Sequence, residues 1–197
     1  VALGAALARR VRDNDLVAGL AVTDRLSGED CHDPVDVADA VAAASGKPVL
    51  LHISGKGSDE HRVREVLARA ASSGIRNLLA VTGDRSEKHP PRRLGRIPKH
   101  PAGHHDSVAT LQVAEDTGLG FFTAGGVNPY KYNPPDTYLQ YYKMMRKLDS
   151  GAEFLVTHAG WDMKKLQELQ WYLQMRETDV PVLARVALLA PEEISRI

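Results

Sequence analysis

Cysteine is almost absent from this sequence, which has one, Cys31, among 197 residues. A single cysteine excludes an intramolecular disulfide, and a chain without disulfides is typical of a reducing compartment. We therefore expect the protein to be cytoplasmic.

An excess of charge of either sign is also absent, since 25 lysines and arginines balance 25 aspartates and glutamates. A neutral chain has no basic field to attract nucleic acid. No apolar run approaches the roughly 20 residues that a membrane helix needs, and no secretory signal pattern opens the chain. We expect neither a nucleic acid nor a membrane as a partner.

Several common catalytic motifs are missing as well. The sequence has no Ser-His-Asp signature, no phosphate-binding P-loop, no CxxC pair and no GxGxxG fingerprint. His52 and His158 are conceivable zinc ligands together with a carboxylate, but nothing in their spacing favours a zinc site. We therefore predict that the protein holds no metal.

The chain does contain a repeat of short apolar runs that alternate with stretches of helical periodicity. The predicted strands are residues 16–22, 48–51, 77–81, 119–122, 153–156 and 180–183. The predicted helices are residues 35–44, 59–73, 106–117, 136–150 and 162–175, with a further helix starting near residue 191. Near-continuous apolar strands are typical of a sheet covered on both faces, so the pattern predicts a parallel α/β fold.

A doubly wound sheet and a barrel both fit this alternation. Six βα units without a GxGxxG fingerprint favour the (β/α)8 TIM barrel, which usually needs about 250 residues. We therefore expect residues 1–197 to form a single, incomplete barrel domain. The first and last strands would be absent from the given sequence, as in part of a longer natural chain.

Polar residues follow the apolar runs at their carboxyl ends, where parallel barrels build their active sites. Asp84 follows Gly83 directly after one run, where it could stabilise positive charge on a substrate or control the reduction of a cofactor. An N-cap or turn role for Asp84 stays open. His52 and His158 occupy matching positions on separate strands, which favours a shared cavity over two unrelated core histidines.

Three further segments have a possible role in binding. Residues 85–105 form a long basic loop with four histidines, either a mobile surface lid or a lid that grips phosphate or carboxylate. Residues 125–129, Gly-Gly-Val-Asn-Pro, are predicted to be a loop that lets a flat ligand approach the backbone. Tyr138, Tyr141 and Tyr142 have helical spacing, which favours packing of a helix on the barrel over stacking on a ligand.

Two strings in the sequence resemble one family. Residues 74–84, GIRNLLAVTGD, are similar to the "GI-N-ALRGD" segment of the 5,10-methylenetetrahydrofolate reductases, and residues 147–158, KLDSGAEFLVTH, resemble its "K-x-DAGA-F-ITQ" segment. Residues 180–191 are a weaker echo of its "I-PGI-P" strand. The order and spacing of these segments agree with the family over most of the chain.

The resemblance implies a (β/α)8 barrel that binds FAD at the carboxyl ends of its strands. NAD(P)H would reduce the flavin, which would pass hydride to 5,10-methylenetetrahydrofolate and give 5-methyltetrahydrofolate. A divergent member could instead transfer hydride from the nicotinamide directly to the folate. The protein would be an oxidoreductase acting on CH–NH donors in one-carbon metabolism and methionine biosynthesis. Its partners would be a folate and a nicotinamide nucleotide, with homo-oligomers possible.

The resemblance also assigns roles to particular residues. Asp84 would be catalytic and would lie near both flavin and pterin, and His158, where the family has glutamine, would bind the substrate. The other residues that the resemblance assigns to the cofactor are Thr23, His52, Gly83, Asn128 and Lys147. The glutamate that acts as general acid on the family's first strand has no counterpart in this sequence. The basic loop would meet the glutamate tail of the folate.

Two alternatives to a reductase remain. The first is a barrel that binds pterin or methyltetrahydrofolate and serves methyl transfer to another protein. The second is a non-catalytic member of the family that uses its helical exterior as an interaction scaffold.

Overall fold

A computed structural model describes residues 1–24, 32–55, 59–82 and 106–188. Their strands are β1 (Leu20–Val22), β2 (Val49–Ser54), β3 (Asn77–Val81), β4 (Phe122–Val127), β5 (Phe154–Ala159) and β6 (Val182–Arg185). Their helices are α1 (Ala2–Arg10), α2 (Pro34–Ser45), α3 (Glu60–Ser72), α4 (Ser107–Asp116), α5 (Pro134–Leu148) and α6 (Met163–Met175). None of these helices is long and apolar enough to cross a membrane.

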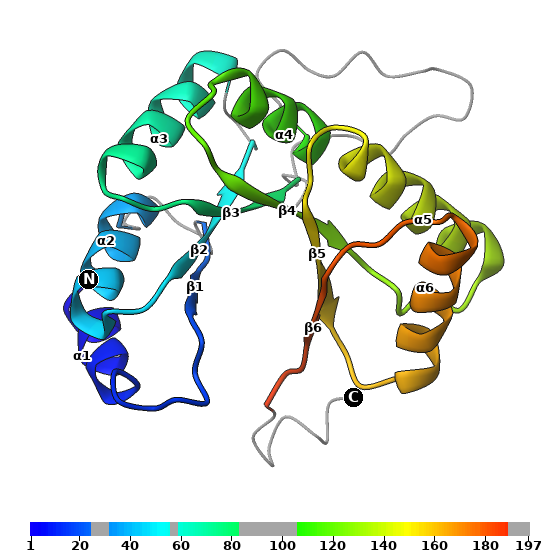
Figure 1. Ribbon diagram of the computed structural model, residues 1–197, viewed down its shortest axis with the longest axis horizontal. Coiled ribbons are helices and arrows are strands. Elements are labelled where there is room, and N and C mark those ends of the chain that lie inside the picture. The colour runs from blue at the N-terminus through cyan, green and yellow to red at the C-terminus, as the bar shows by residue number, and fades with distance from the viewer. Residues whose placement is uncertain (25–31, 56–58, 83–105, 189–197) are drawn as a thin grey trace, which may run out of the picture.

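The strands form one parallel sheet in the order β1-β2-β3-β4-β5-β6, so each strand pairs with the next along the chain. The sheet curves into an arc with the helices on its convex side, and the edge strands β1 and β6 lie on opposite sides of the concave side (Figure 1). This half-barrel confirms the predicted parallel α/β fold. The described residues contain six strands of the eight that were predicted for a closed barrel.

Aspartates at the starts of the helices explain why four of the helices begin where they do. The carboxylates of Asp33, Asp59, Asp106 and Asp162 each accept a backbone N–H of the first turn at 2.9 Å. Gly46 ends α2 in the left-handed region, with a φ of 69°, which glycine adopts without strain. These signals place the predicted helices within about two residues of the observed ones.

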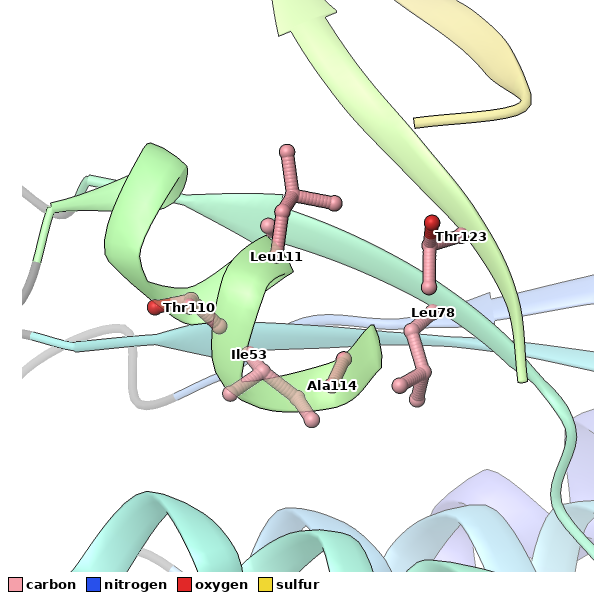
Figure 2. Close-up of a pocket in the computed structure, with 7 residues that line it drawn as sticks. Ile53, Leu78, Thr110, Leu111, Ala114 and Thr123 are labelled. Carbon is pink, nitrogen blue, oxygen red and sulfur yellow. The ribbon is translucent and has the colours of Figure 1, made fainter. Parts of the chain in front are cut away.

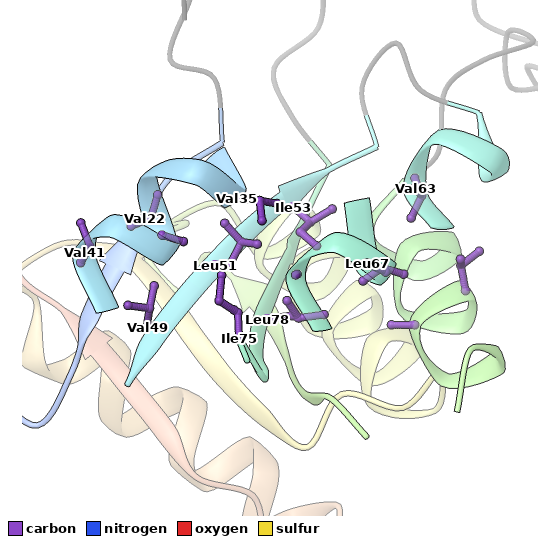
Figure 3. Close-up of a cluster of buried hydrophobic side chains, with 14 of the residues drawn as sticks. Val22, Val35, Val41, Val49, Leu51, Ile53, Val63, Leu67, Ile75 and Leu78 are labelled. Carbon is purple, nitrogen blue, oxygen red and sulfur yellow. The ribbon is translucent and has the colours of Figure 1, made fainter. Parts of the chain in front are cut away.

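The main core lies between the convex face of the sheet and the helices. Leu51 and Ile53 of β2 and Leu78 of β3 point toward this layer and pack with Val35 of α2 and Leu67 of α3 (Figure 3). Leu51 and Leu67 have no exposed surface. Because successive side chains of a strand alternate between its faces, the residues between these positions point to the concave face.

A smaller apolar cluster forms the floor of the concave face. Leu79, Ala124, Phe154 and Val156 are buried together there. Phe154 also stacks on the ring of Phe122, with a centroid distance of 4.7 Å. The concave face is therefore apolar at its base.

The fourth strand differs from the prediction. Residues 119–122 were expected to form it, but β4 runs from Phe122 to Val127 and includes the glycines expected in a loop. Glycine at residue 125 allows close packing of α5, since a Cβ there would lie 3.1 Å from the Cβ of Lys147. Packing of a helix side chain on the strand, rather than a turn, accounts for this glycine.

The tyrosines of α5 differ in their burial. Tyr141 is buried and its ring lies 4.7 Å from that of Tyr172 on α6, as expected for packing on the barrel. Tyr138 and Tyr142 are exposed, so the same expectation was wrong for them. Their positions on the helix turn them away from the sheet.

We predict that Gly160→Ala lowers the free energy of unfolding by about 1–3 kcal/mol, the usual cost of overpacking. A Cβ at residue 160 would lie 2.3 Å from Cε2 of Tyr130, whose ring packs on the Gly160 backbone. Urea unfolding of the variant measures the change. Gly126→Ala is the matched control, since a Cβ there meets nothing within 4 Å. Equal unfolding midpoints for the two variants would contradict the close packing of Tyr130.

Candidate functional site

The carboxyl ends of the strands carry the polar side chains of the concave face. His52 lies between Leu51 and Ile53, which pack on the helices, and it pairs in register with Leu79 of the inner cluster. His158 lies two residues after Val156 of the same cluster and is exposed. Alternation along β2 therefore gives His52 the concave face. The pairing of β5 with β6 shifts register between Val156 and Ala159, and a cavity shared by His52 and His158 stays a prediction.

His52 is the buried polar group of this face, with 7% of its surface exposed. Burial lowers the pKa of its imidazole below the ordinary value, and the positive charge of Arg185 lowers it further. The carboxylate of Asp24 acts in the opposite direction. The net effect favours the neutral form of the imidazole.

The two charges that act on His52 come from the neighbouring strand β1 and from the distant strand β6. Arg185 ends β6, and three strands separate β6 from β2 in the sheet. Its charge therefore reaches His52 across the concave side rather than through neighbouring strands. Asp24 follows β1, so charges at the ends of both edge strands act on His52.

Backbone hydrogen bonds fix the ends of these strands. The carboxylate of Asp24 accepts the backbone N–H of Ser54 at 2.8 Å, which ties the end of β1 to the end of β2. The backbone N–H of Arg185 donates to Oγ1 of Thr157 at 2.9 Å. Thr23, which the resemblance assigns to the cofactor, is exposed directly after β1.

Arg185 and Asp24 are residues to which the sequence analysis assigns no role in the site. The sequence feature that could have identified them is a charged residue directly after an apolar run. Which of the two faces such a residue occupies depends on the strand register, and the sequence alone does not determine that register.

The end of β4 leaves room beside the backbone. Gly126 pairs with Val156 of the inner cluster, and a Cβ at Gly126 would meet nothing within 4 Å. Asn128 follows β4, is half-buried and accepts the backbone N–H of Tyr130 at 3.1 Å through Oδ1. A flat ring could therefore approach the backbone at Gly126, although this segment is strand rather than loop.

Lys147 lies on the other face of the sheet. Its side chain packs on Gly125, and its Nζ donates a hydrogen bond to the backbone carbonyl of Gly126. Burial lowers the pKa of Lys147 to about 8, and the nearby charge of Lys143 contributes. The amine thus lies between α5 and β4, and its assignment to the cofactor stays a prediction.

Two predicted site residues, Gly83 and Asp84, and the basic loop of residues 85–105 lie outside the described residues. The expectation that Asp84 and His158 share a cleft therefore stays a prediction. Within the described ranges, no group of three or more His, Cys, Asp or Glu could hold a metal ion.

A separate hollow lies on the convex side of the sheet (Figure 2). It is lined by Ile53, Leu78 and Thr123 from the strands and by Thr110, Leu111 and Ala114 from α4. Its volume of about 10 Å³ has room for no more than one water molecule. This hollow is a packing gap, so the candidate site is the strand-end cluster on the concave face.

A parallel sheet with helices on its convex side and polar residues at its strand ends defines the class of β/α-barrel proteins. A family model described as methylenetetrahydrofolate reductase matches residues 3–193. The chain belongs to the methylenetetrahydrofolate reductase family, as the motifs at residues 74–84 and 147–158 predicted.

Solved structures show the same fold at low sequence identity. A Clostridium thermocellum protein, described as binding two copies of 5-methyl-5,6,7,8-tetrahydrofolic acid, has a TM-score of 0.67 and 13% identity over 93% of this chain. The match covers 58% of that protein, so this chain spans under two thirds of its length. A search of the curated proteins finds no match.

Two further solved structures with this fold are described by other activities. A phosphonopyruvate hydrolase solved with oxalate and Mg²⁺ has a TM-score of 0.59 and 12% identity, over 90% of this chain and 62% of that one. A lyase or mutase from Burkholderia cenocepacia J2315 has a TM-score of 0.58 and 19% identity, over 98% of this chain and 69% of that one. These similarities concern the fold alone.

We predict that Arg185→Gln raises the pKa of His52, because it removes a positive charge that opposes protonation. Asp24→Asn should lower the same pKa, because it removes the charge that favours protonation. NMR titration of the His52 Cε1 proton, assigned with His52→Gln, measures both. An unchanged pKa in both variants would show that these strand ends do not share one space.

We also predict that the free energy of unfolding rises between pH 8 and pH 10 because of Lys147. Its pKa is about 8 in the folded protein and 10.5 in the unfolded chain, so in this window the unfolded chain binds the extra proton. The gain is about 3 kcal/mol at most and disappears below pH 8. Lys147→Met should lose this rise in urea unfolding measured across that window. A variant whose stability follows the same pH profile as the parent would contradict the burial of the amine.

Proposed function

We propose that the concave face binds a reduced folate and that the protein reduces 5,10-methylenetetrahydrofolate to 5-methyltetrahydrofolate with NAD(P)H. The observation that carries the proposal is the convergence of Asp24, His52 and Arg185 above an apolar floor. Family membership supplies the reaction class.

The chemistry suits a site of this kind. Opening the methylene bridge breaks the bond from carbon to N10 and gives an iminium ion at N5. N10 keeps the bonding electron pair and takes up one proton from water. Hydride from NAD(P)H, passed directly or through a flavin, then adds to the iminium carbon and makes the methyl group. A carboxylate stabilises the iminium cation, and Asp84 is the residue that the resemblance assigns to this role.

The described strand ends also suit a flat cofactor. Bound FAD would accept hydride from NAD(P)H and pass it to the folate. Thr23, His52 and Asn128 would hold it, and the open backbone at Gly126 accepts a planar ring at close range. A neutral His52 accepts or donates one hydrogen bond without placing a charge against the ring.

A second candidate function is binding of 5-methyltetrahydrofolate for methyl transfer. The similarity to the Clostridium thermocellum protein, which is described as binding that folate, favours this candidate. It needs the same concave face but no reductant.

We predict that the purified protein oxidises NAD(P)H, followed by absorbance at 340 nm, only when methylenetetrahydrofolate is present. Asp84→Asn should lower this rate at least tenfold, about the effect of one charge interaction in a transition state. Asp13→Asn, an exposed carboxylate before β1, is the control and should keep the parent rate.

The other outcomes separate the candidates. Binding of 5-methyltetrahydrofolate by calorimetry without NAD(P)H oxidation would contradict the reductase and support methyl transfer. Absence of both binding and oxidation would contradict both functions. A flavin absorption spectrum of the purified protein would support FAD as the hydride carrier.

A further inference from the structure

Arg185 is held in a fixed place at the rim of the concave face. Its backbone N–H donates to Thr157, and its carbonyl accepts the N–H of Gly160 at 3.1 Å. Two residues later, the carbonyl of Ala187 accepts the indole N–H of Trp161 at 3.2 Å. The backbone on both sides of Arg185 is therefore anchored to β5 and the segment that follows it.

Within the described part of the chain, the fold makes no use of the Arg185 guanidinium. None of the ion pairs among the described residues includes it, and the side chain is exposed. Structural arginines of this chain behave differently: Arg69 pairs with Asp33 and Asp36 at 2.8 and 2.7 Å. Val182 of β6 packs against the helices, so alternation along the strand gives Arg185 the concave face that His52 also occupies. Among the described residues, its positive charge there has no ion-pair partner.

The concave face is apolar at its base and charged at its rim, so it suits a ligand whose two ends differ in polarity. Leu79, Phe154 and Val156 make an apolar floor that suits a ring, and His52 is buried near them. Arg185 is exposed at the rim, where the end of a ligand that leads to solvent would lie. A guanidinium has donors only and pairs with carboxylates through two parallel hydrogen bonds.

We propose that Arg185 binds the glutamate carboxylate of a reduced folate whose pterin ring lies on the apolar floor. The proposal rests on the proposed function, because it takes the ligand to be a folate. It identifies Arg185 as a specificity residue for the charged tail and assigns the residue no part in hydride transfer.

The test compares two ligands by calorimetry: 5-methyltetrahydrofolate, which has one glutamate, and 6-methyltetrahydropterin, which has none. Arg185→Gln should weaken 5-methyltetrahydrofolate binding at least tenfold and leave 6-methyltetrahydropterin binding unchanged. Arg185→Lys should lose less affinity, because it keeps the charge but not the paired donors. Arg146→Gln, an exposed arginine on α5, is the control and should bind both ligands as the parent does.

A second readout tests proximity to His52. A bound carboxylate would offset the charge of Arg185, so 5-methyltetrahydrofolate should raise the pKa of His52 in the parent protein and not in Arg185→Gln. Thermal unfolding of Arg185→Gln should match that of the parent, since the side chain makes no ion pair with the described residues.

The outcomes that overturn the proposal are distinct. Equal 5-methyltetrahydrofolate binding by the parent and Arg185→Gln would overturn the role of Arg185 and leave the proposed function standing. Equal weakening of both ligands would show that Arg185 does not recognise the tail. A parent protein that binds neither ligand would overturn the proposed function, and this assignment with it.

Discussion

The alternation of side chains across one curved parallel sheet is the constraint on which the rest of this structure depends. Residues such as Leu51, Ile53 and Leu78 point to the helices and form the main core. Since burial of apolar area is the dominant stabilising term, that layer provides most of the stability. The concave face is thereby free to hold a histidine, two strand-end charges and an unfilled position at Gly126.

Curvature adds a second consequence. In a flat sheet of this order, β6 would lie far from β2, and Arg185 would have no influence on His52. The arc brings the ends of β1, β2 and β6 toward one space, so the charge of Arg185 lowers the pKa of His52, 133 residues away in the sequence. Electrostatic coupling between strand ends is therefore a property of the whole arc and not of any one motif.

The sequence predicts the parts of this fold that depend on local chemistry. Apolar runs locate β3, and aspartate caps locate the starts of α2, α3, α4 and α6, because both signals act within a few residues. The prediction of β4 was wrong because the packing of Lys147 on Gly125 is a tertiary contact. Arg185 was missed as a site residue because the pairing of β5 with β6 shifts register between Val156 and Ala159. No local sequence pattern predicts that shift in strand pairing.

Proteins that share this fold carry out unrelated reactions, so the fold cannot decide between the functions considered above. The concave face of this chain is apolar at its base and charged at its strand ends. An apolar floor of Leu79, Phe154 and Val156 lies below a neutral buried imidazole, and charges of both signs lie at the strand ends. A ligand that matches this gradient has a flat, weakly polar ring at one end and an anionic group at the other. Reduced folates have that form, and both reduction and methyl transfer act on them, which is why the ligand is a firmer inference than the reaction.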